Sequence, residues 1–230
     1  MRVLSFDTST EWLTVAAGNG SAWTAHQERA GSANSERILP LVDAVLAEAG
    51  WRLADLDGIA FGAGPGAFTG VRIACSVAQG LALGANIPVV AVPTLLAVAQ
   101  HAWSEHSATR VLACLDARMA EVYVAFHVRD GDGWRTEREP AVVKPADVSV
   151  PAYGPWDGAG DGFRAYPDLA AHTRVARVFV DTLPTARAIG ELALPLLASG
   201  QGVAPSEALP LYVRHRVALT TSERNAGMRL

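Results

Sequence analysis

The sequence has few cysteines and no concentrated positive charge. Cys75 and Cys114 are its only cysteines, and neither lies in a C-x-x-C motif or beside a histidine. They predict core positions, not a disulfide framework, and a reducing, cytoplasmic setting. The net charge is −4, with 19 basic residues scattered along the chain. This argues against the chain gripping nucleic acid by itself, because phosphate binding needs a concentrated basic face.

Long hydrophobic runs are also missing. Apolar stretches are broken by glycine, proline or charge before the ~18–20 residues that a membrane span needs. The start of the chain, where Arg2 leads into a strand carrying Asp7, is unlike a signal peptide. Half of the 230 residues are nevertheless hydrophobic. Length and composition therefore predict a globular chain of one large or two small domains, without a membrane segment.

Apolar periodicity and turn residues predict the order of the elements. In the first half we expect strands over 2–6, 12–17, 21–27, 57–62 and 87–92, and helices over 35–49, 69–83 and 93–103. Asn34 or Ser35 is the expected cap of the first helix. In the second half we expect strands over 110–115 and 121–128 and a helix over 184–199. The segment 129–170 predicts only short elements, because it is rich in Gly, Pro, Asp and Trp.

The order β-β-β-α-β-α-β-α is typical of a mixed α/β sheet with helices on both faces. Three strands joined by hairpins would pair antiparallel, and the later strands would add in parallel. The second half restarts with paired strands and has at least one later helix. It could be a shorter copy of the first half, and the pattern alone leaves that open.

Residues 61–73, FGAGPGAFTGVRI, resemble a phosphate-binding loop at the start of a helix. The stretch departs from G-x-x-x-x-G-K-[ST], because Val71 follows Gly70 where a lysine is required. It also departs from G-x-G-x-x-G after Gly64 and Gly66. A weak anion site at the helix N-terminus remains open. We favour a tight structural turn with Ala67 and Phe68 packed beside it.

The helix behind this turn is apolar nearly all round, which predicts burial on two sides. Small residues at 74, 78 and 82 would let a second helix approach closely, and helix 35–49 has a similarly broad apolar face. The partner could be intramolecular, but two such helices side by side suggest an interface with another subunit. The predicted interface residues are Ser35, Ile38, Leu39, Leu41, Val42, Val45, Leu46, Val71, Ala74, Cys75, Ala78 and Ala82.

Polar residues offer few catalytic candidates. Asp7-Thr8-Ser9-Thr10 follows a strand and could position Mg²⁺ and phosphate, or form an Asx or ST turn. His101 and His106 are five apart, which does not place both on one helical face, so no metal site is predicted. No serine lies in a G-x-S-x-G motif. The sequence therefore shows no convincing nucleophile, base or metal cluster.

Several motifs together are strongly similar to the TsaB (formerly YeaZ) family. They are FDTST, NSERILPLVDAVL, GAGPGAFTGVRIACSVAQGLALG and LDARMAEVYVA. The match is near continuous over residues 1–128 and returns at Leu211-Tyr212-Val213-Arg214, which resembles the family's C-terminal Y-[VL]-R. One departure is Asn34, where family members commonly have His. It puts in doubt any role of that His in partner contacts.

The resemblance implies two ribonuclease-H-like lobes of the actin/sugar-kinase/Hsp70 (ASKHA) superfamily, the second one reduced. We expect lobes over 1–104 and 105–217 and a disordered tail over 218–230. The resemblance also implies a non-catalytic paralogue of the enzyme TsaD. The two metal-binding histidines of TsaD fall here on Thr94 and Val98, so neither metal nor other cofactor is expected.

The resemblance further implies a function in the threonylcarbamoyl modification of the adenosine beside the tRNA anticodon. The chain would pair with TsaD through the two apolar helices, support TsaE binding, and form a homodimer when alone. It would meet tRNA only through that complex. A vestigial nucleotide cleft is expected at Asp7, Thr8, Ser9, Gly64, Gly66, Asp116 and Arg118. The alternatives are a weak kinase-like ATPase using this cleft, or a protease acting on TsaD.

Overall fold

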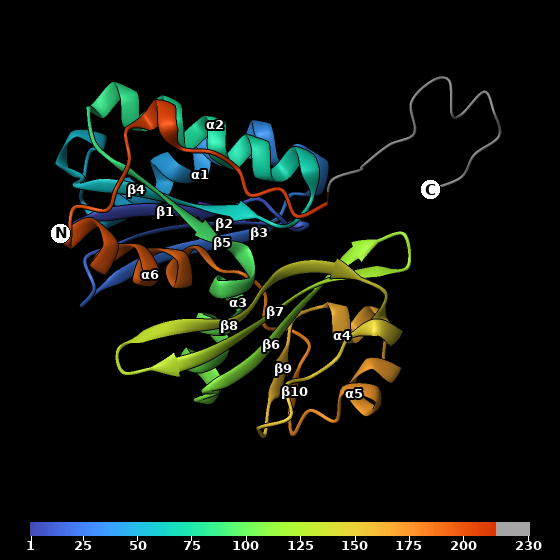
Figure 1. Ribbon diagram of the computed structural model, residues 1–230. Coiled ribbons are helices and arrows are strands. Elements are labelled where there is room, and N and C mark those ends of the chain that lie inside the picture. Colours follow the sequence, from blue (N-terminus) through green and yellow to red (C-terminus); the bar gives the residue numbers. More distant parts are fainter. Residues whose placement is uncertain (215–230) are drawn as a thin grey trace, which may run out of the picture.

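Two five-stranded sheets organise the chain in the computed structural model, which describes residues 1–214 (Figure 1). In the first sheet β1 pairs antiparallel with β2 and parallel with β4, so the predicted mixed sheet is confirmed. The strand order is β3-β2-β1-β4-β5. Its strands are β1 (Val3–Asp7), β2 (Trp12–Gly18), β3 (Trp23–Arg29), β4 (Gly58–Gly64) and β5 (Val89–Pro93).

Helices cover both faces of this sheet because its central strands are apolar on both sides. Leu4 and Phe6 of β1 pack in one core cluster with α1 (Asn34–Ala49) and α2 (Phe68–Ala85). Val3, from the other face of β1, packs with α6 (Ala186–Ala198). The ribbon shows α1 and α2 above the sheet and α6 below it (Figure 1).

The last helix belongs spatially to the first lobe. Helix α6 packs on β1, β2 and β4, and Ser5 Oγ donates to Ala186 O at 2.6 Å across 181 positions of sequence. The predicted boundary after residue 104 placed this helix in the second lobe, whereas in the structure it packs on the first sheet. Sequence position could not reveal the return, because α6 is amphipathic and would fit either sheet. Residues 218–230, predicted as a tail, lie outside the described residues.

The second lobe repeats the five-stranded plan with much smaller helices. Its strand order is β10-β9-β6-β7-β8, with parallel pairing of β6 to β9 and antiparallel pairing of β6 to β7. The strands are β6 (Arg110–Arg118), β7 (Glu121–Asp130), β8 (Gly133–Val143), β9 (Asp157–Ala159) and β10 (Val178–Phe179). The short α4 (Gly162–Ala165) and α5 (Asp168–Thr173) replace the long helices of the first lobe. The expected two-lobed ASKHA-type fold with a reduced second lobe is confirmed.

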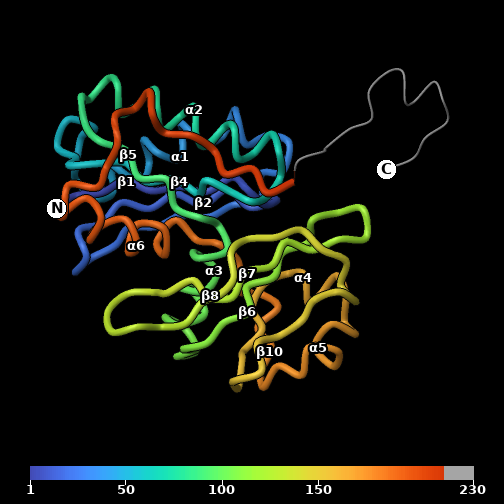
Figure 2. Tube along the Cα trace, in the orientation of Figure 1, coloured from blue at the N-terminus to red at the C-terminus, as the bar shows by residue number. Residues whose placement is uncertain are grey.

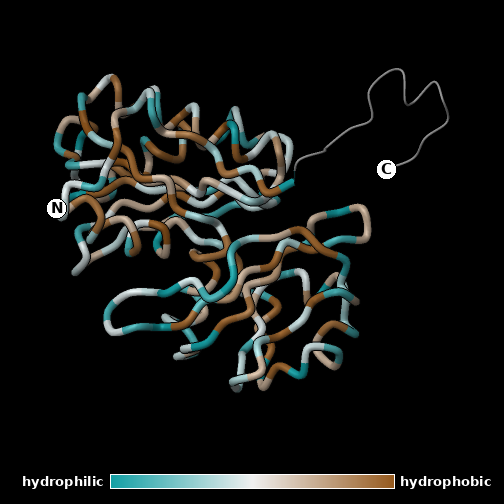
Figure 3. Tube along the Cα trace, in the orientation of Figure 1, coloured by the Kyte–Doolittle hydropathy of each residue, from teal (hydrophilic) through white to brown (hydrophobic). Residues whose placement is uncertain are grey.

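Helix α3 (Thr94–His106) leads from the first lobe into the second and contacts β6 and β7 as well as α6. The trace shows the chain crossing there between the two lobes (Figure 2). Coloured by hydropathy, the central strands of both lobes are largely hydrophobic, and the loop joining β7 to β8 is hydrophilic (Figure 3). Each lobe therefore has its own core, and α3 lies between them.

Two local predictions differ from the structure. The position before α1 is Ala33, and no side chain caps the helix, whereas Asn34 or Ser35 was expected to do so. A single-turn 3-10 helix, Gly31–Ala33, precedes α1 instead. Strand β8 spans eleven residues inside the segment expected to hold only short elements. Its pairing with β7 supplies the order that its own Gly, Pro and Trp content does not indicate.

Among the described residues one helix, α2, is long and apolar enough to cross a membrane by length and composition alone. Its Gly70, Val71, Ala74, Cys75, Ala78 and Ala82 are buried. One side of α2 therefore packs against the strands, and the other side is exposed.

Candidate functional site

The glycine-rich turn packs against the loop that follows β1. Thr8 Oγ1 donates to Gly70 O at 2.6 Å, and Ala67 N donates to Ser9 O at 2.7 Å. A Cβ added at Gly70 would lie 1.8 Å from Thr8 O, closer than any real Cβ contact. Glycine is required there because two backbones meet. The structural role that we favoured for this turn therefore has a specific cause.

Asp7, the last residue of β1, directly precedes Thr8 and Ser9 and is completely buried. Its Oδ1 accepts hydrogen bonds from Ser9 N at 2.9 Å and Ser9 Oγ at 2.8 Å. No described residue hydrogen-bonds to Oδ2, which faces Gly62, where an added Cβ would lie 1.8 Å away. Burial raises the pKa of Asp7 to about 6, against the lowering effect of the Ser9 hydrogen bonds. This carboxylate lies in the core and not on a cleft wall.

The segment Leu211–Arg214, here called the strap, crosses from the first lobe to the second. Leu211 N donates to Ala63 O at 2.7 Å, and Leu211 O lies against Gly64, where an added Cβ would be 2.7 Å from it. Gly64 has a φ of +106°, a backbone conformation that glycine adopts readily and residues with a Cβ rarely adopt. Gly64 N donates to Thr94 Oγ1 at 3.0 Å. The strap therefore covers the glycine turn at the point where a nucleotide cleft was expected.

At its other end the strap is anchored to the hairpin between β6 and β7. Arg214 Nη2 contacts Glu121 Oε2 at 2.6 Å and donates to Ala117 O at 3.1 Å. The Arg214 side chain is 12% exposed. This charge-assisted, mostly buried pair is stronger than an ordinary surface ion pair. It ties the chain's C-terminal segment to the second lobe.

The predicted cleft residues form two groups. Asp7, Thr8 and Ser9 contact the glycine turn in the first lobe, whereas Asp116 and Arg118 belong to the β6–β7 hairpin. Within residues 1–214 no hydrogen bond joins the two groups directly. Asp116 Oδ2 instead pairs with Arg118 at 3.0 Å. The strap lies between the groups, in contact with both lobes.

The predicted interface residues are mostly inside the chain's own core. Ten of the twelve are buried, and Ala74, Ala78 and Ala82 pack in the same cluster as strand residues. The stripe that was predicted to admit a partner helix instead lets α2 approach the sheet. Ser35 and Leu39 remain exposed, and Leu39 has 48% of its surface accessible. Binding of a partner by these helices stays a prediction. Of the predicted residues, Ser35 and Leu39 are the exposed ones that such a partner could contact.

The outward side of α2 carries a second small-residue stripe. Ser76, Gly80 and Gly84 recur at four-residue spacing and are exposed, and a Cβ at Gly80 or Gly84 would meet nothing within 4 Å. Leu83 beside them is 74% exposed. The internal packing of the chain does not require glycine here, although each one weakens the helix by about 1 kcal/mol relative to alanine. The sequence analysis did not identify this stripe, because apolar periodicity follows large apolar residues, and serine and glycine do not contribute to it.

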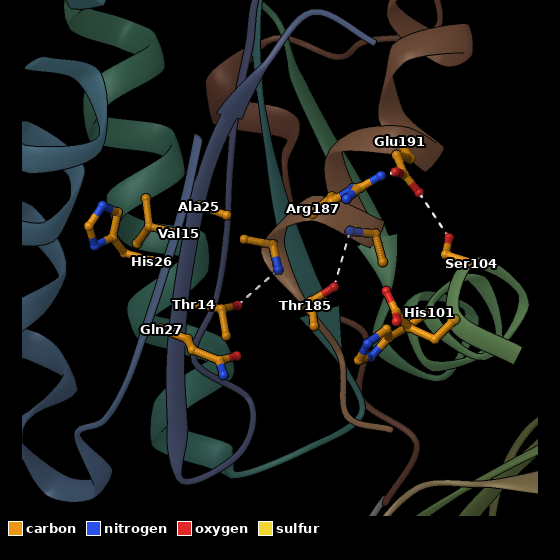
Figure 4. Close-up of a pocket in the computed structure, with 13 residues that line it drawn as sticks. Thr14, Val15, Ala25, His26, Gln27, His101, Ser104, Thr185, Arg187 and Glu191 are labelled. Atoms are coloured by element: carbon orange, nitrogen blue, oxygen red, sulfur yellow. Dashed lines mark hydrogen bonds and ion pairs between the residues drawn. The ribbon is translucent and has the colours of Figure 1, made fainter. Parts of the chain in front are cut away.

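A cavity of about 330 Å³ lies between β2, β3, α3 and α6, and several of its polar side chains form hydrogen bonds within the chain (Figure 4). Thr14 Oγ1 accepts from Ala186 N at 2.9 Å, and His101 Nδ1 contacts Leu183 O at 2.7 Å. Glu191 binds Arg187 at 2.8 Å and Ser104 Oγ at 3.4 Å. His26, although it lines the cavity, pairs with Glu48 of α1. The Thr14 bond joins α6 to β2, and the bond between Ser104 and Glu191 joins α3 to α6.

Over residues 1–214 we looked for a hydroxyl group in contact with a histidine that could act as its general base. The hydroxyl–imidazole contact that occurs there joins Thr136 Oγ1 to His127 Nδ1 at 3.3 Å. Burial lowers the pKa of His127 to about 4, so the ring is a weak base at neutral pH. No group of three metal-ligating side chains occurs in that part of the chain. The described residues thus offer no assembled hydrolytic site.

Sequence reasoning did not anticipate the strap. It noted Tyr212 and Arg214 as part of a C-terminal motif but assigned them no place in the cleft. The similarity of this segment to the family's Y-[VL]-R motif was a signal, but a motif does not show where a segment docks. Only the contacts with Ala63 and Glu121 show where it docks.

The fold and this site together define the class of protein: a two-lobed α/β protein of the ASKHA type, with a C-terminal strap that contacts both lobes. Comparison with known proteins narrows the class. A family model described as TsaD, tRNA N6-adenosine threonylcarbamoyltransferase, matches residues 25–209. The chain is 44% identical to the tRNA threonylcarbamoyladenosine biosynthesis protein TsaB of Escherichia coli, over 95% of this chain and 96% of that one.

Two further comparisons agree. TsaB of Haemophilus influenzae is 36% identical over 94% of this chain and 95% of its own. The solved structure of YeaZ from Pseudomonas aeruginosa superposes with a TM-score of 0.86 at 40% identity, over 92% of this chain and 99% of that one. The chain belongs to the TsaB (YeaZ) family.

Proposed function

We propose that this chain is a non-catalytic subunit required for the threonylcarbamoyl modification of the adenosine next to the anticodon, in tRNAs that read ANN codons. It acts in the cytoplasm by forming a heterodimer with TsaD and supporting TsaE binding, and it meets tRNA only through that complex. The observation that carries the proposal is the similarity to TsaB of Escherichia coli over nearly the whole of both chains.

The site supports a scaffold more than an enzyme. Asp7 is buried in the core, and Leu211 O lies against Gly64 where a phosphate would approach the turn. Thr94, at the position of a TsaD metal ligand, is fully buried and accepts the Gly64 hydrogen bond. A hydroxyl in that role holds the turn and cannot replace an imidazole ligand.

The exposed sides of α1 and α2 are the proposed TsaD surface. Leu39 and Leu83 supply apolar anchors, and the stripe Ser76, Gly80 and Gly84 would let a partner helix approach closely. Both helices lie on the same face of the first sheet (Figure 1). In the absence of TsaD the same surface would pair with a second copy of this chain, because exposed apolar helix faces tend to associate.

Reconstitution tests the function directly. TsaD, TsaE, the enzyme that forms threonylcarbamoyl-adenylate, and unmodified tRNA are combined with and without this chain, and the modified nucleoside is quantified by mass spectrometry. We expect modification only when the chain is present. Equal modification in the reaction that lacks this chain would contradict the proposal.

Surface variants test the interface separately. Gly80→Arg and Leu39→Asp place charge on the exposed helix faces without touching the core, and should abolish co-purification with TsaD. Ala198→Arg, an exposed position on α6 at the opposite face of the sheet, is the matched control and should leave it intact. Co-purification that survives both helix variants would show that another surface binds TsaD.

The two enzymatic alternatives have their own readouts. Isothermal titration with Mg-ATP and incubation of TsaD with the purified chain should show neither binding nor cleavage. ATP hydrolysis abolished by Asp7→Asn would favour the kinase-like reading, and cleavage of TsaD abolished by Thr136→Ala would favour the protease.

A further inference from the structure

A chain of contacts joins aromatic, methionine and arginine side chains across the two lobes. The Arg72 guanidinium lies 3.8 Å from the Phe68 ring centroid and 5.6 Å from that of Tyr212, and Arg72 Nε donates to Tyr212 Oη at 2.8 Å. Two residues further along the strap, Arg214 Nη1 reaches Met119 Sδ at 3.0 Å. We call Phe68, Arg72, Met119, Tyr212 and Arg214 the strap surface.

Large parts of this surface are left uncovered by the fold. Phe68 is 41% exposed, Tyr212 48% and Met119 49%. Phenylalanine, tyrosine, methionine and arginine are the residue types enriched in the buried centres of protein interfaces. Because their positions are already held by mutual contacts, binding would lose little additional side-chain entropy.

The backbone at one edge of the surface is strained. Arg118, Met119 and Ala120 have φ of 61°, 54° and 58° in succession, at the two-residue turn between β6 and β7. Such turns favour Asn-Gly because side chains with a Cβ resist positive φ. The Arg118 side chain is 83% exposed and gains an ion pair with Asp116. Strained backbone that presents exposed side chains is characteristic of functional sites.

The surface carries one arginine whose charge is not paired within the described residues. Arg118 pairs with Asp116 and Arg214 with Glu121, so Arg72 is the arginine of this surface that has no carboxylate partner among the described residues, on a chain of net charge −4. No described residue accepts a hydrogen bond from Arg72 Nη1 or Nη2, which leaves the planar fork that binds a carboxylate.

We propose that the strap surface binds an acidic segment of a second protein, with a carboxylate on the Arg72 fork and an adjacent apolar side chain against Phe68, Tyr212 and Met119. The inference goes beyond the proposed function, because the surface begins at the first turn of α2 and extends onto the second lobe. RNA fits less well, because Arg72 already covers the Phe68 ring face and phosphate binding needs several cations.

Peptide selection tests the proposal on the full-length chain. Random 12-residue peptides displayed on phage are selected on the wild-type chain and counter-selected on the double variant Arg72→Glu/Tyr212→Ala. Enriched peptides should carry Asp or Glu beside Leu, Phe or Trp. A fluorescein-labelled synthetic copy should lose at least tenfold in affinity for the double variant. Enrichment without carboxylates, or equal binding by both proteins, overturns the proposal.

Two further measurements decide between occupants. A labelled single-stranded 20-nucleotide RNA should bind wild type and double variant equally weakly, and RNA binding lost in the variant would replace the protein partner with nucleic acid. Sedimentation velocity should give the same oligomeric state for both, and a dimer lost in the variant would assign the surface to a second copy.

Matched variants guard against a trivial loss of folding. Arg52→Glu changes an arginine of the first lobe whose side chain is 82% exposed, and peptide affinity should be unchanged. Met119→Asn/Ala120→Gly supplies the residues that the turn favours, so the melting temperature should rise while peptide affinity falls at least threefold. A rise in melting temperature with unchanged affinity would remove the hairpin from the surface and overturn that part of the proposal.

Discussion

Asp7 places an ionisable carboxyl group in the core of the first lobe. Its Oδ1 is satisfied by Ser9, and its Oδ2 faces Gly62 without a described partner. An ionised carboxylate is poorly solvated in such a place, which is why burial dominates its pKa. The residue therefore destabilises the fold at neutral pH, and its effect has a predictable pH dependence.

Stability should fall with rising pH because of this residue. The pKa of Asp7 is raised from 3.8 to about 6 on folding, so its favourable contribution is complete below pH 3.8 and is lost as the pH rises through about 6. From pH 4 to pH 8 this loss amounts to about 2 kcal/mol. Asp7→Asn should remove it, as measured by urea unfolding of both proteins across that range.

The comparison between the two proteins isolates the residue, since all other carboxyl groups titrate in both. The free energy of unfolding of Asp7→Asn should rise relative to wild type as the pH increases. Parallel pH profiles for the two proteins would contradict the raised pKa.

At the scale of an element, α2 meets two different environments along its length. Its inward glycine, Gly70, touches the backbone of Thr8, while its outward glycine, Gly80, faces open space. The same substitution at the two positions therefore has opposite physical consequences.

In the monomeric chain, at concentrations too low for two copies to pair, Gly80→Ala should stabilise the fold by up to about 1 kcal/mol, because alanine favours the helix and meets no neighbour within the chain. Gly70→Ala should destabilise it by more than about 2 kcal/mol, because the new Cβ must displace the β1 loop. Differential scanning calorimetry of both variants checks the two signs. A destabilising Gly80→Ala in the monomeric chain would contradict the open space beside Gly80.

The elements of the first lobe were largely predictable because their signals are local. The buried strands β4 and β5, and the helices α1, α2 and α3, follow from apolar periodicity between turn residues. Strand β8 was missed because Gly133 and Pro140 weaken its local signal, and its pairing with β7 supplies the order. The absent cap of α1 shows the same limit, since the 3-10 turn before it decides how the helix begins.

At the scale of the whole molecule, the strap follows both lobes in the sequence and contacts each of them. Its anchors are the backbone bond from Leu211 to Ala63 and the pair between Arg214 and Glu121. Both contacts link residues more than 90 positions apart. The strap thus adds to the connection that α3 makes between the lobes.

Arg214→Ala should loosen the strap. The loss of a mostly buried, charge-assisted pair that leaves Glu121 without its partner is worth about 1–3 kcal/mol. Hydrogen exchange of the Leu211 amide should accelerate while amides in β1 stay protected. Arg52→Ala, which breaks the exposed pair with Asp55, is the control and should cost less than about 1 kcal/mol. Unchanged Leu211 exchange in Arg214→Ala would show that Arg214 does not hold the strap.

The candidate site was only partly predictable. The sequence indicated that residues 7–9 and the glycine turn matter, but a nucleotide cleft and a packed backbone contact share the same glycines. Similarly, the apolar residues of α1 and α2 marked the helices correctly, while their burial against the sheet left only Ser35 and Leu39 of the predicted set exposed. Periodicity measures how apolar a face is, and cannot tell which body covers it.

The sequence by itself determined the mixed α/β class, the elements of the first lobe and the family, because these depend on local patterns and on motifs that lie close together along the chain. The tertiary structure alone decided that α6 returns to the first sheet, that the strap covers Gly64, and that Asp7 is a core residue. Each of those outcomes depends on contacts between segments far apart in sequence, and the free energy of such contacts exists only once both partners have folded.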